Sequence, residues 1–101
     1  MTTSPDLTTR QNIAETLRGG LFTAKEISRA VGVREKEVLD HLPHVARSVA
    51  RAGGLRFAVE QSNCLSCGFE FRKRERLKTP SRCPICSSEE ITEMRFGIIE
   101  E

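Results

Sequence analysis

The four cysteines of this 101-residue chain form two pairs of identical spacing, Cys64 with Cys67 and Cys83 with Cys86. Two residues lie inside each pair and fifteen lie between the pairs, which falls within the spacing range of four-thiolate zinc sites. A C-x-x-C turn, or knuckle, points both of its sulfurs to one place, so the two knuckles are expected to hold one zinc ion in a tetrahedral shell. All four positions of that shell belong to protein sulfur, and the ion is therefore expected to be structural rather than catalytic.

The residues after each pair bear on the geometry of the knuckles. Gly68 follows the first pair, and glycine adopts the positive φ that a sharp knuckle needs at no steric cost. Ser87 holds the matching position after the second pair, so we expect the second knuckle to be less tight. Iron can replace zinc in such a shell, and the sequence separates the two metals poorly. Disulfides would fit a secreted protein, but nothing in the sequence indicates export. A redox-active pair would need a thioredoxin-like context, and the sequence shows none.

The composition is that of a globular protein, with 38% hydrophobic and 30% charged residues. A formal charge of +2 permits nucleic-acid binding without requiring it. Residues 1–6 are polar and do not form a signal peptide, and no apolar run approaches the ~20 residues of a membrane span. We therefore expect a cytoplasmic protein with no membrane partner, in a compartment where thiols stay reduced and available to metal.

The first half of the chain has the pattern of three helices. Residues 1–7 are expected to be a flexible tail, and a capping box of Thr8 and Gln11 predicts a helix over residues 9–18 that Gly19 and Gly20 end. Residues 21 and 22 form an apolar connector. A second capping box, Thr23 with Glu26, opens the next helix, and Gly32 ends it.

A third helical pattern runs through residues 38–52 after a short turn. Arg34 is a poor residue at its N-cap, and Pro43 is expected either to kink the helix or to divide it. Two helices joined by a short turn containing glycine form a helix-turn-helix. Residues 55–60 then alternate as a strand, and three helices followed by a strand outline a winged helix.

These motifs resemble those of a known class of proteins. The segment TAKEISRAVGVREKEVLDHL, residues 23–42, resembles the helix-turn-helix of winged-helix transcriptional regulators. Together with the cysteine pairs, residues 8–99 resemble the small, mainly archaeal, predicted transcriptional regulators that fuse such a domain to a C-terminal zinc ribbon. The resemblance implies an α+β fold. A winged helix-turn-helix domain would span residues 8–60, and a small β zinc ribbon with rubredoxin-like knuckles and a C-terminal strand would span residues 61–101.

In a helix-turn-helix the N-terminal part of the second helix enters the major groove of DNA. The candidate base-reading residues are therefore Arg34, Lys36, Glu37, Asp40 and His41. Arg47 and Arg51 are candidates for phosphate contact. Residues 1–61 carry nine basic and seven acidic side chains, which is weak for phosphate neutralisation, so an ordinary solvated face stays an alternative. His41 and His44 are not expected to bind metal, because the four-cysteine site is already complete.

The stretch between the cysteine pairs is strongly basic. Residues 72–82 carry about +5, with only Glu75 opposing the basic side chains of Arg72, Lys73, Arg74, Arg76, Lys78 and Arg82. Such a cluster can bind a nucleic-acid backbone or an acidic protein surface, and a solvated hairpin tip is the alternative.

Residues 55–60 and 94–99 are both extended and apolar. The ribbon could therefore be inserted in the wing, with its ends closing on one sheet. We favour a ribbon simply appended to the helical domain, with residues 94–99 as its own third strand.

The expected function is that of a transcriptional regulator that binds double-stranded DNA, with a homodimer through the apolar face of the first helix as an open possibility. The alternative is a module of the transcription machinery, because the large subunit of general transcription factor E has a similar layout and contacts RNA polymerase and promoter without reading an operator. An enzyme is not expected, since paired carboxylates and a phosphate-binding glycine loop are absent from the sequence.

Overall fold

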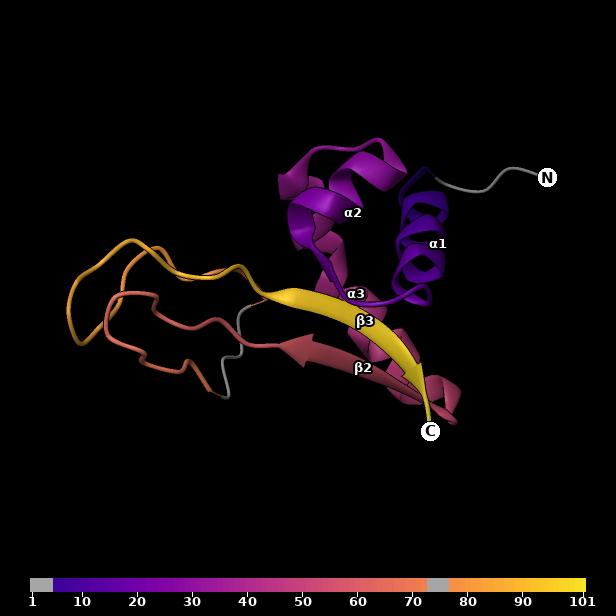
Figure 1. Ribbon diagram of the computed structural model, residues 1–101. Helices are drawn as coiled ribbons and strands as arrows, with labels where there is room; N and C mark the ends of the chain where they lie inside the picture. The colour runs from indigo at the N-terminus through magenta and orange to yellow at the C-terminus, as the bar shows by residue number, and fades with distance from the viewer. Residues whose placement is uncertain (1–4, 73–76) are drawn as a thin grey trace.

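The computed structural model describes residues 5–72 and 77–101, with side chains from Thr8 onward. Its elements are, in chain order, α1 (Pro5–Leu17), β1 (Phe22–Thr23), α2 (Ala24–Val31), α3 (Glu35–Ala52), β2 (Leu55–Glu60) and β3 (Arg95–Glu100). Three helices are followed by a small antiparallel sheet, and a zinc ribbon projects from it (Figure 1). The expected α+β class is confirmed.

The first helix begins earlier than the sequence pattern indicates. Helix α1 starts at Pro5, so Thr8 lies inside it and cannot be the N-cap of a helix beginning at residue 9. Proline is favoured at the first position of a helix, and this preference outweighed the capping box. Part of the expected tail is thus helical, and its residues 1–4 lie outside the described residues. The side chains of Ile13 and Leu17 are fully buried in the core. They are therefore not available as the dimer surface that the sequence left open.

Helix α2 has the ends that the sequence predicts. The Thr23 hydroxyl accepts the backbone N–H of Glu26 at 3.1 Å, and the Glu26 carboxylate accepts the backbone N–H of Thr23 at 2.9 Å. At the other end Gly32 has a left-handed φ of 80° and donates its N–H to the Ser28 carbonyl. Both caps hold the short turn that leads into α3.

Helix α3 runs uninterrupted through Pro43, so the alternative of a divided helix is wrong. Arg34 occupies its N-cap without a side-chain hydrogen bond, as the sequence indicates. One face of the helix is buried against the other two helices and the sheet. The apolar residues of this buried face are Val38, Leu42, Val45 and Val49.

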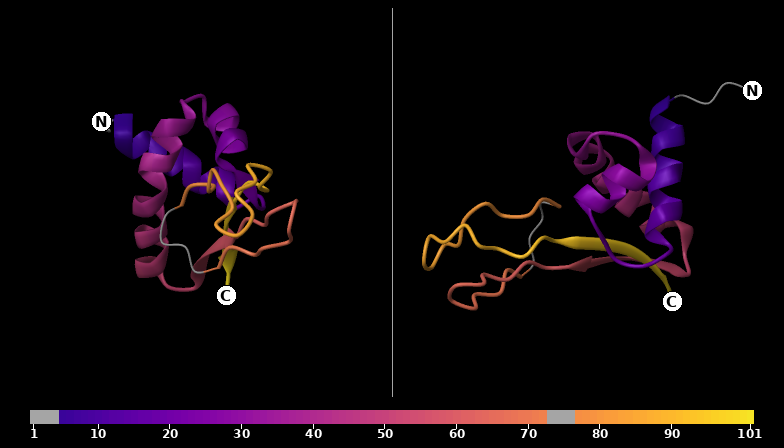
Figure 2. Two further views of the ribbon diagram at one scale, coloured as in Figure 1. Left: turned by 90° about the vertical axis from the view of Figure 1, so that its left-hand side faces the viewer. Right: turned by 45° about the horizontal axis from the view of Figure 1, so that its top comes forward.

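The sheet has the strand order β1-β3-β2, and both pairs are antiparallel. Strands β2 and β3 pair over their whole length, from Leu55 opposite Glu100 to Glu60 opposite Arg95. The helices cover one face of the sheet, where Phe96 and Ile98 of β3 are buried (Figures 1 and 2). The sequence pattern predicts a connector at residues 21 and 22 and does not indicate β1, because a strand of two residues has no detectable alternation.

The pairing of β2 with β3 corrects the expected topology. The appended ribbon is wrong, because the last strand belongs to the wing sheet and not to the ribbon. The ribbon therefore departs from the end of β2 and returns to the start of β3 as an insertion in the wing, and it projects beyond the sheet (Figure 2). Within the described part of the ribbon the extended pairing is limited to two bridges, Asn63 with Glu70 and Cys64 with Ile91.

The base of the ribbon is tied to the helical core. Met94, just before β3, is 1% exposed, and its backbone N–H donates to the Thr79 hydroxyl at 2.9 Å. Leu77 packs against the core cluster of the helices and the sheet. The two halves therefore share one packed junction. Among the helices of residues 5–72 and 77–101, none is both long and apolar enough to cross a membrane.

Candidate metal centre and nucleic-acid interface

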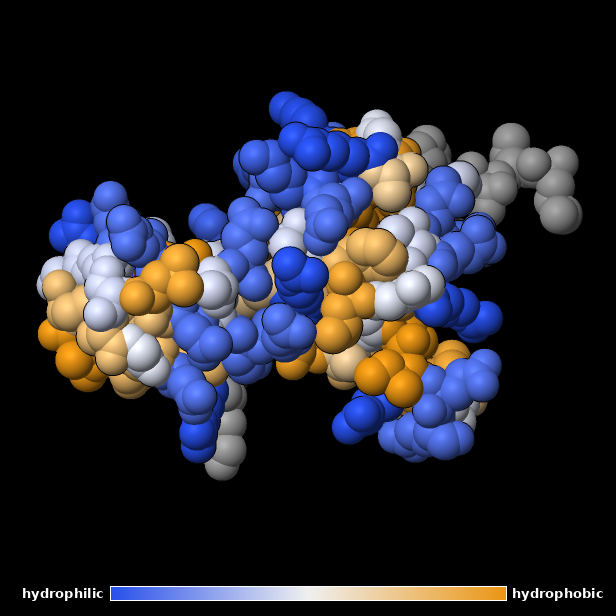
Figure 3. Space-filling model, viewed as in Figure 1, coloured by the Kyte–Doolittle hydropathy of each residue, from blue (hydrophilic) through white to orange (hydrophobic). Residues whose placement is uncertain are grey.

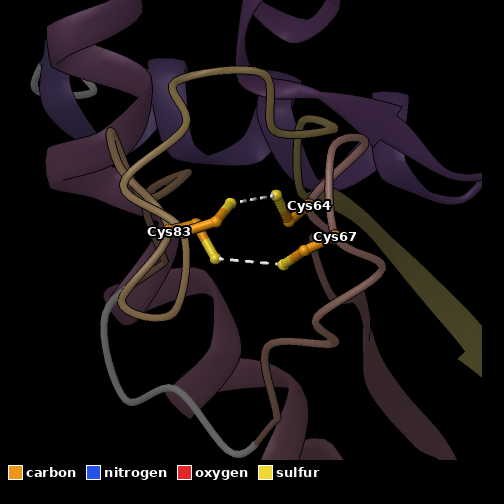
Figure 4. Close-up of side chains that lie close together, drawn as sticks. Cys64, Cys67 and Cys83 are labelled. Carbon is orange, nitrogen blue, oxygen red and sulfur yellow. Dashed lines mark hydrogen bonds between the residues drawn. The ribbon is translucent and has the colours of Figure 1, made fainter.

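The two knuckles bring all four cysteine sulfurs together (Figure 4). The Sγ atoms of Cys64 and Cys86 lie 3.5 Å apart, those of Cys67 and Cys83 lie 3.6 Å apart, and all four lie within 4.8 Å of one another. A tetrahedral zinc ion with ~2.3 Å bonds to sulfur requires sulfurs about 3.8 Å apart. All four cysteines are free of disulfide bonds, so the geometry is that of a metal shell.

The backbone repeats the same turn at both knuckles. Cys64 donates its N–H to the Phe69 carbonyl, and Cys83 donates to the Ser88 carbonyl five residues on. Gly68 has a φ of 79° and Ser87 has a φ of 62°. The second knuckle is therefore built like the first, and the expected looser turn is wrong. Ser87 accepts a left-handed conformation that glycine adopts more cheaply.

Polar contacts support the sulfurs and join the knuckles. Ile85 donates its backbone N–H to the Cys83 sulfur at 3.4 Å, a bond that stabilises a thiolate. Across the site the hydroxyls of Ser66 and Ser88 lie 2.8 Å apart, and Leu65 donates its N–H to the Glu90 carbonyl. These bonds hold the two knuckles in register around the metal position. No pattern in the sequence predicts the serine pair, because the two serines occupy different positions in the two knuckles.

The thiols titrate unequally in this arrangement. Hydrogen bonding from the Cys67 backbone N–H outweighs burial and lowers the pKa of Cys64 to about 7. The backbone N–H of Phe69 acts in the same direction on Cys67, but burial and the neighbouring thiols prevail and raise the pKa of Cys67 to about 12. Without a cation, the Cys67 and Cys86 thiols, whose pKa values are raised in this crowded site, resist losing their protons. A divalent ion that binds thiolates supplies the missing charge, and the four residues fit structural zinc.

The third helix presents most, but not all, of the predicted DNA-binding residues to solvent. Arg34, Lys36, Asp40, Arg47 and Arg51 are exposed, and Glu37 is half-buried. His41 does not belong with them. It is 8% exposed, and its Nδ1 accepts a hydrogen bond from the Arg10 side chain of α1 at 3.0 Å. The sequence pattern placed His41 among the base-reading candidates, and its partner on α1 could not be predicted from local spacing.

The basic stretch of the ribbon is partly paired with acid. Arg72 forms an ion pair with Glu70, and Arg82 pairs with Glu89 at 3.4 Å. These pairs are exposed and of little energetic weight. Lys78 is also exposed, and it lines a small hollow together with Glu35 and Leu39 of α3. Lys73, Arg74 and Arg76 lie outside the described residues.

Two apolar side chains at the outer end of the ribbon were not singled out in the sequence. Leu65 is 67% exposed and Ile85 is 68% exposed, and each lies between the two cysteines of its pair. Apolar surface gathers at this outer end (Figure 3, left). The signal in the sequence was an apolar residue between the two cysteines of each C-x-x-C motif.

Comparison with known proteins agrees with this architecture. Residues 8–57 match a family described as PF0610-like, N-terminal, and residues 61–101 match the PF0610 rubredoxin-like zinc beta-ribbon domain. The solution NMR structure of protein PF0610 from Pyrococcus furiosus is 31% identical and has a TM-score of 0.79, with 100% of this chain and 97% of that chain covered. A comparison with curated proteins found no match. The resemblance seen in the sequence is thereby confirmed for the combination of the two domains.

Proposed function

The chain belongs to the PF0610-like family, and we propose that it is a DNA-binding transcriptional regulator whose helix α3 contacts double-stranded DNA. The zinc ribbon has a structural part in this proposal, because its four thiolates leave the metal no open position. No catalytic role is included. The observation that carries the proposal is the charge of the outward face of α3.

That outward face is more basic than the sequence of the helix suggests. Lys36, Asp40, Arg47 and Arg51 follow one another at intervals of four, seven and four residues, so they share one side of the helix. All four are exposed, and Asp40 is the one acidic member. Three cations along one exposed side suit phosphate contact, which supplies most of the affinity for DNA.

The other acidic residues of the first turn point elsewhere. Glu37 pairs with Arg34 at 3.4 Å, and Glu35 lies beside Lys78 in the hollow between α3 and the ribbon. The near balance of charge counted along the sequence therefore does not apply to the outward face of α3. The ribbon adds Lys78 next to the N-terminal end of α3, on the part of a helix-turn-helix that approaches the major groove.

The decisive experiment is selection of bound sites from a random duplex pool by zinc-loaded protein at near-physiological salt. A site-specific regulator enriches a motif of defined sequence. A pool that stays flat while the protein still binds duplex would overturn the regulatory proposal.

A second candidate is a module of the transcription machinery, similar in layout to the large subunit of general transcription factor E. The exposed Leu65 and Ile85 favour it, because apolar side chains at the end of a projecting arm suit contact with another protein. Capture of RNA polymerase subunits that is lost in the Leu65→Lys variant, together with a flat selection pool, would favour this candidate.

A further inference from the structure

One edge of the central strand lacks a complete partner. Strand β1 pairs with β3 only at Phe96 and Arg95, whereas β3 continues to Glu100. The backbone N–H of Glu101 donates to Gly54, at the β2 side, at 2.9 Å. Backbone groups of alternate residues in a strand point to opposite edges. The N–H and C=O groups of Ile98 and Glu100 therefore point to the β1 side, beyond the end of β1.

A groove with apolar walls runs along this edge. It lies between residues 18–21 and the end of β3, and its apolar members are Leu21, Leu55, Ile98 and Ile99. Leu21 is 39% exposed and Ile99 is 42% exposed. In the described part of the chain no backbone hydrogen bond reaches Ile98 or Glu100 on this side. Unpaired strand edges with apolar side chains pair readily with another strand.

We infer that this edge pairs with the same edge of a second copy of the chain, so that the protein dimerises through antiparallel β3 strands. The spacing of the free groups sets the register. Ile98 of one copy lies opposite Glu100 of the other, and each copy brings two N–H and two C=O groups to the pairing. The two Ile99 side chains then meet on the two-fold axis. They form a non-hydrogen-bonded pair, in which antiparallel side chains approach most closely.

The charged side chains at the groove are also compatible with a second copy of the chain. One basic and one acidic side chain, Arg18 and Glu100, border the groove of each copy, and the antiparallel strand of a second copy would carry its own Glu100 into that groove. The pairing joins the two wing sheets into one sheet and does not use the outward face of α3. Dimerisation is therefore independent of DNA binding, and either property can fail without the other.

Sedimentation equilibrium of the zinc-loaded full chain tests the pairing. We expect a monomer–dimer equilibrium that Ile99→Lys weakens at least about tenfold, because a charge at the centre of the pairing must be desolvated. Leu65→Lys is the matched control, since Leu65 is even more exposed but lies at the far end of the ribbon, and it should leave the equilibrium unchanged. A wild-type chain that stays monomeric at millimolar concentration, or a dimer that Ile99→Lys does not weaken, overturns the inference.

Cross-linking tests the register independently. Non-hydrogen-bonded pairs lie about 4.5 Å apart at Cα, which is within the range that a disulfide spans. With zinc bound, Ile99→Cys should oxidise in air to a covalent dimer faster than Leu65→Cys does. Equal rates for the two variants would contradict the proposed axis.

Discussion

Ser87 and Gly68 hold the same backbone position in the two knuckles, and both have a left-handed φ. The amide of each donates to the carbonyl of the first cysteine of its pair, so the conformation is required to close the turn. Serine pays a steric cost there that glycine does not. The sequence identified the position correctly at Gly68, but it could not show that the second knuckle imposes the same φ on a serine.

The Ser87→Gly variant should therefore strengthen the zinc-bound fold. We expect a gain of about 0.5–1 kcal/mol, which is the relief of left-handed strain less the backbone entropy of glycine. The reverse test, Gly68→Ala, should cost about 1 kcal/mol. Denaturant unfolding of the zinc-loaded variants measures both. A destabilised Ser87→Gly protein would show that the serine side chain matters more than its backbone conformation.

Gly97 of β3 lies under the segment that connects α1 to β1. A Cβ atom at this position would stand 2.6 Å from the Gly20 carbonyl oxygen, which belongs to the backbone and cannot swing aside. We expect Gly97→Ala to destabilise the protein by about 1–3 kcal/mol in thermal or denaturant unfolding. Gly19→Ala is the control, because its added Cβ would be 3.4 Å from the nearest atom and should cost much less. Equal losses for the two variants would refute the close approach.

Among the elements, those whose ends are fixed by local bonds could be predicted from the sequence. The capping box of Thr23 and the left-handed Gly32 depend on residues at most five positions apart, so local spacing determines them. The start of α1 and strand β1 depend on competing or long-range contacts. The pairing of β1 with β3 joins residues more than seventy positions apart, and periodicity carries no information about it.

Helix α3 gives the element-scale test of DNA binding. Reversing Arg47 and Arg51 together to Glu should weaken duplex binding and lower the steepness of its salt dependence by about two units of slope, because about 0.9 is lost for each phosphate contact removed. The readout is the affinity measured over a series of salt concentrations. Arg95→Glu is the control, since Arg95 is exposed on β3 and borders a hollow with Glu60 and Thr92 rather than with residues of α3. The α3 interface is excluded if the control changes the slope as much as the double variant does.

At the scale of the whole molecule, the inserted ribbon links the metal to the wing. The four cysteines were found from spacing alone, because C-x-x-C pairs encode their own geometry. The insertion of the ribbon in the wing could not be found in this way, since residues 55–60 and 94–99 look equally able to form separate sheets. Two long-range features determine that the ribbon is inserted. One is the pairing of β2 with β3, which flank the ribbon in the sequence, and the other is the burial of Met94 beneath the helices.

Removing the metal should therefore unfold the ribbon before the helices. The described part of the ribbon has two isolated bridges and little core of its own, so metal binding supplies much of its folding free energy. With a strong chelator we expect the amides of Cys64, Gly68, Cys83 and Ser87 to exchange rapidly while the helical circular dichroism signal persists. Unchanged exchange at these amides would show that the ribbon folds without metal.

Native mass spectrometry of the zinc-loaded chain is the sharpest test of whether four sulfurs hold one structural zinc ion in the wing. One zinc ion per chain is predicted, bound with loss of thiol protons, and Cys86→Ser should weaken its retention under chelator. A metal-free chain, or a mass lowered by the hydrogens lost on forming two disulfides, would contradict the account.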